Sequence, residues 1–116
     1  MKYLCLIYDD ETRWDRMSKD EATAGYGKYY TFTEGIKAKG HYVNGNPLKP
    51  TSTATTVRVR SETVSTTDGP YAETKEQLGG YYLVEAKDMA EAVAIAARIP
   101  VGDGGAVEVR PILPMG

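Results

Sequence analysis

Two segments of this sequence are apolar on both of the faces that a β-strand presents, and they constrain the fold more than any other feature. Successive side chains of a strand point to opposite faces of its sheet. A strand that is apolar on both faces is covered on both. The alternating apolar sets are Tyr3/Cys5/Ile7 and Leu4/Leu6/Tyr8 in the first segment, and Tyr81/Leu83 and Tyr82/Val84/Ala86 in the second.

Two helices are predicted between and after these strands. The run Ser18–Glu21 reads SKDE, which has the form of a capping box at a helix N-terminus. Apolar and aromatic residues follow at helical spacing, and the helix should end near Lys39, with Gly40 as its stop. A second helix should begin after Asp88 as N-cap and end before Pro100. Residues 9–17 are charged and are predicted to be irregular.

A short strand, a hairpin and a last strand complete the pattern. Residues 41–48 read as a short strand that enters a loop with the turn sequence NGNP. Residues 54–66 alternate around the turn residues Ser-Glu and predict a hairpin that the following Asp-Gly-Pro breaks, with Val57 and Val59 facing inward. Residues 106–112 form the last strand.

This order predicts an α+β fold: a ferredoxin-like β-α-β-β-β-α-β domain with one antiparallel sheet and two helices on one face. The other face would then expose the second apolar set of each long strand, and an apolar patch of that size calls for a cover. We expect a second copy of the chain, stacked sheet to sheet about a two-fold axis. The alternative cover is the pair of loops 9–17 and 47–53.

Size and composition narrow the function classes. The 116 residues indicate one domain over 1–116. A net charge of −2 gives no reason to expect nucleic-acid binding. The apolar runs are too short for a membrane span or a signal peptide, so we expect a cytoplasmic protein. A single cysteine, Cys5, and a single histidine, His41, allow neither a disulfide within the chain nor a zinc site built from several such ligands. No metal or cofactor is predicted.

The stretch TTDGPYAETKEQLGGYYLVEA, residues 66–86, is the main candidate for a site. Asp68 could be a general base or an acceptor, and Lys75 an anion clamp or a carboxylate partner. Asp-Gly-Pro is also ordinary turn chemistry, and the residues alone favour a charged turn.

Other candidates are aromatic or imidazole side chains. A few tyrosines converging on a cavity would suit an aromatic or amphipathic small ligand. His41 lies at a helix-to-strand junction, where a lone histidine is more often a surface or capping residue than a catalytic one.

The run DGPYAETKEQLGGYYLVEAKDMAEAVAIAARIP, residues 68–100, resembles the DGPF-domain proteins of the YCII-related superfamily. Their signature reads Asp-Gly-Pro-Phe, then Glu-Thr-Lys-Glu, then a Gly-Gly-Tyr strand and a short helix that ends in Pro. Tyr71 stands where that family usually has Phe. The opening MKYLCLIYDDE and the closing VEVRPIL also fit, so the resemblance covers nearly the whole chain.

The resemblance implies a dimeric α+β barrel. It also implies a His–Asp dyad, with the His on the first helix and the Asp in the later loop. Asp68 is the counterpart of that Asp, but the helix position is held by Tyr29, so the dyad is incomplete here. DGPF proteins are often associated with extracytoplasmic-function sigma factors, which implies a regulatory or sensing role.

Two hypotheses follow. The first is a small-molecule-binding or regulatory module with a cavity between the sheet and the first helix, edged by Asp68 and Glu73. The second is a cofactor-free enzyme of the monooxygenase or isomerase type, with Asp68 as base and Tyr29 or His41 as partner. The residues expected to bind the ligand are Tyr26, Gly69, Tyr71, Glu73 and Lys75.

Overall fold

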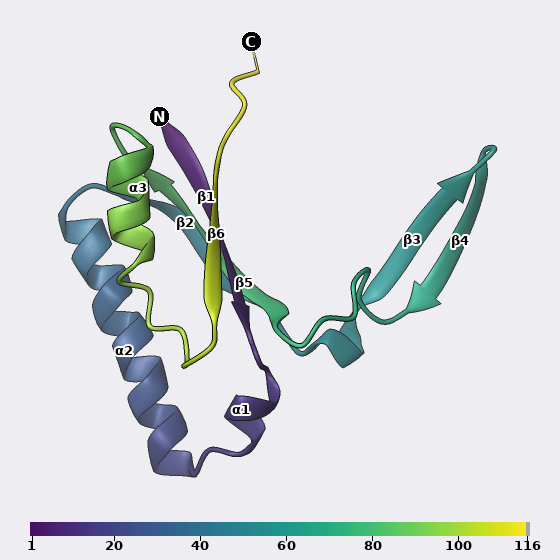
Figure 1. The fold of residues 1–116 in the computed structure, drawn as a ribbon, viewed down its shortest axis with the longest axis horizontal. Helices are drawn as coiled ribbons and strands as arrows, with labels where there is room; N and C mark the ends of the chain where they lie inside the picture. Colours follow the sequence, from purple (N-terminus) through teal and green to yellow (C-terminus); the bar gives the residue numbers. More distant parts are fainter. Residues whose placement is uncertain (116) are drawn as a thin grey trace.

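A four-stranded antiparallel sheet in the order β2-β5-β1-β6 forms the centre of the computed structural model, which describes residues 1–115 (Figure 1). Two further strands, β3 and β4, pair only with each other as a separate hairpin. The strands are β1 (Lys2–Asp9), β2 (Tyr42–Pro47), β3 (Thr55–Arg60), β4 (Thr63–Asp68), β5 (Gln77–Glu85) and β6 (Ala106–Pro111). The helices are α1 (Thr12–Asp15), α2 (Lys19–Ala38) and α3 (Met89–Ala96), with a 3₁₀ turn, η1, at Thr51–Thr53.

The ends of α2 are where the sequence predicts them. Ser18 accepts a hydrogen bond from the backbone N–H of Glu21, and the Glu21 side chain accepts one from the Ser18 N–H, which completes the capping box. The helix closes at Lys39, and Gly40 follows with a φ of +78°, in the left-handed region that glycine adopts without strain. These caps fix the length of the helix.

The helix α3 also has a side-chain cap at its start, but without the reciprocal bond to the N-cap residue itself. The Asp88 side chain accepts from the Glu91 N–H at 2.9 Å, and the Glu91 side chain accepts from the Lys87 N–H. Both α2 and α3 lie on the same side of the sheet, as the ferredoxin-like prediction requires (Figure 1).

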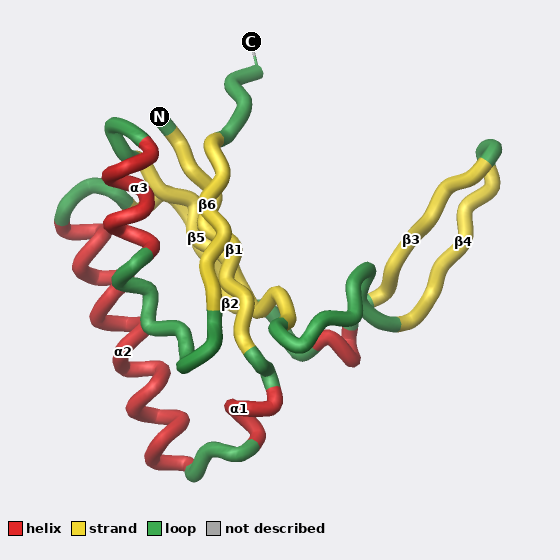
Figure 2. Tube along the Cα trace, in the orientation of Figure 1, coloured by secondary structure: helices red, strands yellow, loops and turns green. Residues whose placement is uncertain are grey.

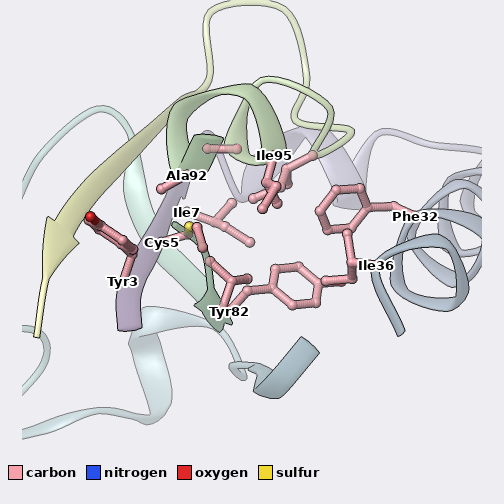
Figure 3. Packing of buried hydrophobic residues seen from close by; sticks show 12 residues of the cluster. Tyr3, Cys5, Ile7, Phe32, Ile36, Tyr82, Ala92 and Ile95 are labelled. Atoms are coloured by element: carbon pink, nitrogen blue, oxygen red, sulfur yellow. The ribbon is translucent and has the colours of Figure 1, made fainter. Parts of the chain in front are cut away.

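The hydrophobic core lies between these helices and one face of the sheet (Figure 3). One alternating set of each long strand points into it. Cys5, which is fully buried, lies at its centre and its pKa is raised to about 11 by desolvation, so the thiol is an inert packing residue. The buried members are Tyr3, Cys5, Ile7, Phe32, Ile36, Tyr82, Val84, Ala86, Ala92, Ile95, Ala96 and Ile99.

The opposite face of the sheet, here called the open face, carries the second apolar set. In the pairing of β1 with β5, Leu4 lies opposite Leu83 and Leu6 opposite Tyr81. These four side chains are only partly buried in the single chain. The residues that we assign to the open face by strand parity are Leu4, Leu6, Tyr8, Tyr81, Leu83, Ala106, Glu108 and Arg110.

The hairpin of β3 and β4, here called the arm, corrects two predictions. It stands away from the main sheet rather than inside one continuous sheet (Figure 2). Val57 and Val59 are 58% and 65% exposed, so they do not face inward as the alternation suggested. Alternation shows that one face of a hairpin is apolar, but it does not say whether the body of the protein covers that face.

The arm also sets the shape of the molecule. The chain measures 47 × 46 × 20 Å, and its radius of gyration is 16.1 Å, whereas a compact chain of this length is expected at about 13 Å. A further correction concerns residues 9–17, which contain the short helix α1 rather than only irregular structure. Within residues 1–115, no helix has the length and apolar character that crossing a membrane requires.

Candidate functional site

A cleft of about 480 Å³ lies on the helix side of the molecule, between α1, the first half of α2 and the loop that precedes β6. Apolar and polar side chains share its wall. Those used below are Arg13, Trp14, Met17, Gly25, Lys28, Tyr29, Val101 and Gly102. Small-molecule sites are concave and combine an apolar wall with a few polar groups, and this cleft offers side chains of both kinds.

Asp9 anchors one side of the cleft. It is the last residue of β1, it has the inward parity of Ile7, and it is only 9% exposed. Its Oδ2 accepts hydrogen bonds from Arg13 Nη2 at 2.5 Å and from the Gly102 N–H at 3.1 Å, while Oδ1 accepts from the Asp10 N–H at 2.9 Å. Because three donors occupy this carboxylate, it joins β1, α1 and the loop before β6.

Arg13 is held tightly in this position. Its guanidinium is paired with Asp9, and a Cβ placed on Gly102 would overlap it. Its Nε is buried and has no hydrogen-bond partner in the described part of the chain. The guanidinium also lies 5.2 Å from the ring centroid of Trp14, a cation–π distance.

Trp14 forms the outer wall next to Arg13. Its ring stacks on that of Tyr26, with centroids 5.0 Å apart and an interplanar angle of 23°. It also packs closely over α2, because a Cβ on Gly25 would come within 2.9 Å of its Cη2 atom. Gly25 is therefore the position in α2 that lets α1 approach closely.

Tyr29 is the half-buried tyrosine of α2 that lines the cleft. Its pKa is raised to about 12, chiefly by desolvation and then by the nearby Asp9 carboxylate, against a smaller opposing effect of Arg13. The phenol therefore stays protonated at neutral pH. It can donate one hydrogen bond to a bound molecule and accept another.

The signature stretch lies elsewhere, at the base of the arm, which we call the elbow (residues 68–77). Asp68 is the exposed last residue of β4. Gly69 has a φ of +108°, donates its N–H to the Ala54 carbonyl at 2.8 Å and accepts from Thr56 Oγ1. Tyr71 is 82% exposed, with the Arg58 guanidinium 5.9 Å from its ring centroid. These contacts close the hairpin.

The second half of the elbow is tied to the end of β1. Gln77 accepts a hydrogen bond from the Glu11 N–H and donates one to the Thr74 carbonyl. The Glu11 carboxylate in turn accepts from the backbone N–H and the hydroxyl of Thr51. Glu73 and Lys75 are exposed beside this network. The elbow therefore sets the angle at which the arm leaves the sheet.

The sequence of the whole chain matches a family profile. The profile is that of the YCII-related domain, and it matches residues 1–116. The chain belongs to the YCII-related family. A relative from Rhizobium meliloti (strain 1021), the uncharacterised protein R00369, is 32% identical over 114 residues, which are 97% of this chain and 92% of the relative.

A solved structure shares the YCII-related fold of this chain. It is 5-chloro-2-hydroxyhydroquinone dehydrochlorinase from Burkholderia phenoliruptrix AC1100, in complex with 2,5-dihydroxybenzoquinone. The TM-score is 0.52 at 15% identity, over 97% of this chain and 94% of the other. At this identity the likeness establishes the fold, an α+β barrel type, which agrees with the predicted class.

The predicted site residues of this YCII-related chain fall into separate regions. Tyr29 lines the cleft, and Tyr26 stacks on a cleft residue. Asp68 ends β4 in the arm, and α2 and the arm lie on opposite sides of the sheet (Figure 1). His41 lies beyond the C-terminal end of α2, with Nδ1 2.9 Å from the Glu85 carbonyl. Ala38, the last residue of α2, lies nine residues after Tyr29. The rise of the helix therefore separates Tyr29 from the helix end that leads to His41 by about 14 Å.

Sequence reasoning missed the residues that build the cleft. Asp9, Arg13 and Trp14 fall in the segment that was predicted to be irregular. One signal was available: Asp9 continues the inward parity of Tyr3, Cys5 and Ile7, and a carboxylate at a buried position needs a partner. Arg13, four residues later, is that partner.

Proposed function

We propose that this YCII-related chain is a small-molecule-binding module whose ligand occupies the cleft at Tyr29. The observation that carries the proposal is the convergence of a protonated phenol, an anchored guanidinium and an indole on one cleft of about 480 Å³. That volume is within the range of ligand sites. The elbow residues, by contrast, are occupied with closing the hairpin and tying it to β1.

The cleft favours a small amphipathic ligand over a polyanion. Arg13 is matched by Asp9, and the remaining charges near the cleft, Lys28 against Glu21 and Asp103, do not sum to a positive field. The apolar wall of Trp14 and Met17 suits a ring or a short hydrocarbon. The compound 2,5-dihydroxybenzoquinone, which the similarly folded dehydrochlorinase binds, is a reference probe. Because its two vinylogous acid groups ionise below neutral pH, neutral substituted phenols match this cleft better.

Calorimetric titration of 2,5-dihydroxybenzoquinone and a panel of substituted phenols tests this proposal. Tyr29→Phe removes the hydroxyl alone and should weaken binding about three- to tenfold, the usual worth of one hydrogen bond. Tyr30→Phe is the matched control, because Tyr30 is the next residue of α2 and is 69% exposed. Equal affinities for the two variants, or no binding across the panel, would contradict the proposal.

We also propose that the functional unit is a homodimer joined through the open face. The support is the partly buried apolar set of Leu4, Leu6, Tyr81 and Leu83, which the helices do not cover. Leu6→Asp should shift the chain to monomer in sedimentation equilibrium. Val93→Asp, a similar change at an exposed position of α3, should leave the dimer intact.

A catalytic role has one observation in its favour, the dehydrochlorinase activity named for the similarly folded protein. In this chain the carboxylate near Tyr29 is Asp9 rather than Asp68. Three donors already occupy Asp9, so it is poorly placed to accept a proton from a substrate. We therefore prefer binding to catalysis. The regulatory role and the sigma-factor link implied by the resemblance remain predictions.

A further inference from the structure

Asn44 and Gly45 lie on β2, an edge strand of the main sheet. The strand order β2-β5-β1-β6 leaves the outer side of β2 without a neighbouring strand in the part of the chain that the structure describes. Asn44 is exposed there, and Gly45 is partly buried. The pairing with β5 is irregular between Tyr42 and Asn44, so the backbone departs from the regular ladder directly before this dipeptide.

The backbone N–H of Gly45 points to the outer edge of β2. Along an antiparallel strand, the N–H groups alternate between the two sides of the strand. Leu48 donates its N–H to the Gly79 carbonyl on β5 at 2.9 Å, so the N–H of Gly45, three positions earlier, lies on the opposite side. There it donates to Asn44 Oδ1 at 2.8 Å. The Gly45 nitrogen therefore lies beside the side-chain amide of Asn44 and outside the ladder with β5.

Packing requires a glycine at position 45. A Cβ there would come within 2.7 Å of the Tyr82 ring and within 3.0 Å of the Tyr81 carbonyl oxygen. Tyr82 belongs to the core, and its hydroxyl forms a 2.7 Å hydrogen bond with that of Thr33, so the ring is held in place. A side chain at position 45 would also hinder any reaction of the backbone nitrogen. The packing that demands glycine thus leaves this nitrogen unhindered.

We propose that Asn44 is a site of spontaneous deamidation in the folded protein. The Gly45 nitrogen loses its proton and attacks Asn44 Cγ. The N–Cγ bond forms, the Cγ–Nδ2 bond breaks, and Nδ2 leaves as ammonia with a proton. Water then opens the cyclic imide: cleavage of the new N–Cγ bond gives aspartate, and cleavage of the original peptide bond gives isoaspartate. The reaction is not a redox step, and water is its only co-reactant.

Asn46 provides a comparison within the same strand. It is also exposed, and it is the other asparagine of the chain. The residue after it is Pro47, whose backbone nitrogen carries no hydrogen and cannot act as the nucleophile. Its Nδ2 donates to Tyr81 Oη at 2.8 Å, so its side chain is also held. Deamidation should therefore distinguish two exposed asparagines that lie two residues apart.

Isoaspartate at position 44 would change the edge of the sheet. It routes the main chain through the side-chain carbons and so adds one methylene to the backbone of β2. From Gly45 to Pro47 the strand pairs with β5 in regular register, which the longer backbone disturbs. Ordinary aspartate adds the same charge without lengthening the chain. Isoaspartate should therefore weaken the pairing of β2, and aspartate should not.

Peptide mapping by mass spectrometry, after weeks of storage in a mildly alkaline buffer, tests the proposal. One wild-type sample stays folded, as circular dichroism verifies, and a second is kept unfolded in urea. We expect the folded sample to lose the Asn44 amide, with aspartate and isoaspartate as products, and to keep Asn46 intact. The variant Asn44→Ser should release no ammonia. An Asn44 that stays intact in the folded sample, whatever happens in urea, overturns the proposal, as does equal conversion of Asn46.

Urea unfolding of the stored protein tests the structural consequence. The isoaspartate form, separated by chromatography, should unfold at a lower urea concentration than fresh wild type. Asn44→Asp should have the wild-type midpoint, because it reproduces the charge alone. Equal midpoints for the isoaspartate form and Asn44→Asp would show that β2 absorbs the added methylene, which overturns this part of the inference.

Discussion

At the scale of single residues, the cleft depends on Asp9, a carboxylate that holds three segments of the chain together. It is bonded to Arg13 on α1, to the Gly102 N–H before β6 and to the Asp10 N–H beside it. Removing one member of a buried ion pair leaves the other charge without compensation. The stability of the cleft should therefore be far more sensitive to Asp9 than to surface carboxylates.

Asp9→Asn should lower the free energy of unfolding by about 2 kcal/mol, because Arg13 loses its partner in a desolvated position. The control is Glu34→Gln, which neutralises an exposed carboxylate of α2 and should cost less than about 0.5 kcal/mol. Urea unfolding followed by circular dichroism measures both. Similar losses for the two variants would show that the Asp9 pair is energetically ordinary.

Tyr29 should give the protein a measurable pH dependence at alkaline pH. Its folded-state pKa is about 12, above the ordinary value of 10.0. Between pH 10 and 12 the unfolded chain has lost this proton while the folded chain retains it, so stability is complete below pH 10 and falls as the pH rises toward 12. Cys5 and Tyr82 also have raised pKa values and add to the decline, with that of Cys5 beginning nearer pH 9.

The variant Tyr29→Phe isolates the contribution of Tyr29. Its unfolding free energy should fall less steeply than that of wild type between pH 10 and 12, while the two curves run parallel below pH 9. Urea midpoints across this range measure the difference. Superimposable slopes would mean that Tyr29 titrates normally in the folded state.

At the scale of elements, the contact between α1 and α2 depends on a glycine inside a helix. Glycine in a helix interior costs up to about 1 kcal/mol relative to alanine. Gly25 has a reason to be there, because Trp14 packs against it, whereas a Cβ on Gly27 would meet nothing within 4 Å. The two positions are otherwise similar, so they form a matched pair.

Gly27→Ala should raise the free energy of unfolding by up to about 1 kcal/mol. Gly25→Ala should lose that gain or reverse it, since the new Cβ must push Trp14 off the helix, and the tryptophan emission should shift to the red. Urea unfolding and fluorescence spectra of the two variants test this. Equal stabilisation by both would show that Trp14 does not need close contact with α2.

Local sequence patterns predicted where the helices begin because the interactions that start a helix join residues close in the sequence. The capping side chains of Ser18 and Asp88 bond to backbone three residues away, so SKDE and Asp88 gave the helix starts directly. The fold class and the two apolar sets of β1 and β5 followed from the sequence pattern, whereas which set faces the helices is known only from the structure. The exposure of the arm could not be predicted from alternation. Whether Val57 is covered depends on where the hairpin lies relative to the sheet, and alternation carries no information about that position.

The candidate site was harder to predict than the fold for a related reason. Charge density drew attention to residues 68–77, but their structural contacts mainly close and orient the arm. The cleft instead joins a segment near the start of the chain, residues 9–29, to the distant loop before β6, so that Asp9 and Gly102 are 93 residues apart. Only Tyr29 was predicted from the family resemblance and also lines the cleft.

At the scale of the whole molecule, the body and the arm are built on different principles. The core takes its buried residues from β1, β5, α2, α3 and their flanks, with none from β3 or β4. The arm is a peripheral hairpin that closes through a tight turn at Ser61 and Glu62, both at positive φ. The body should therefore fold without the arm.

Replacing residues 55–68 with a short Gly-Ser loop should leave thermal unfolding of the body within a few degrees of wild type when both are measured as monomers, on the Leu6→Asp background. The reason is that the excised residues contribute nothing to the core. Differential scanning calorimetry measures the midpoint. A collapse of the cooperative transition would show that the arm belongs to the folding unit.

The inert, buried thiol of Cys5 makes this chain a ready scaffold for site-specific labelling. Its raised pKa and lack of exposure keep it from reacting with maleimides at neutral pH while the protein is folded. A cysteine introduced at Glu62, on the arm's turn, would then be the sole reactive thiol, without any need to remove the native one. Trp14 is the single tryptophan. Energy transfer from Trp14 to a label at residue 62 would therefore measure the separation of the body and the arm.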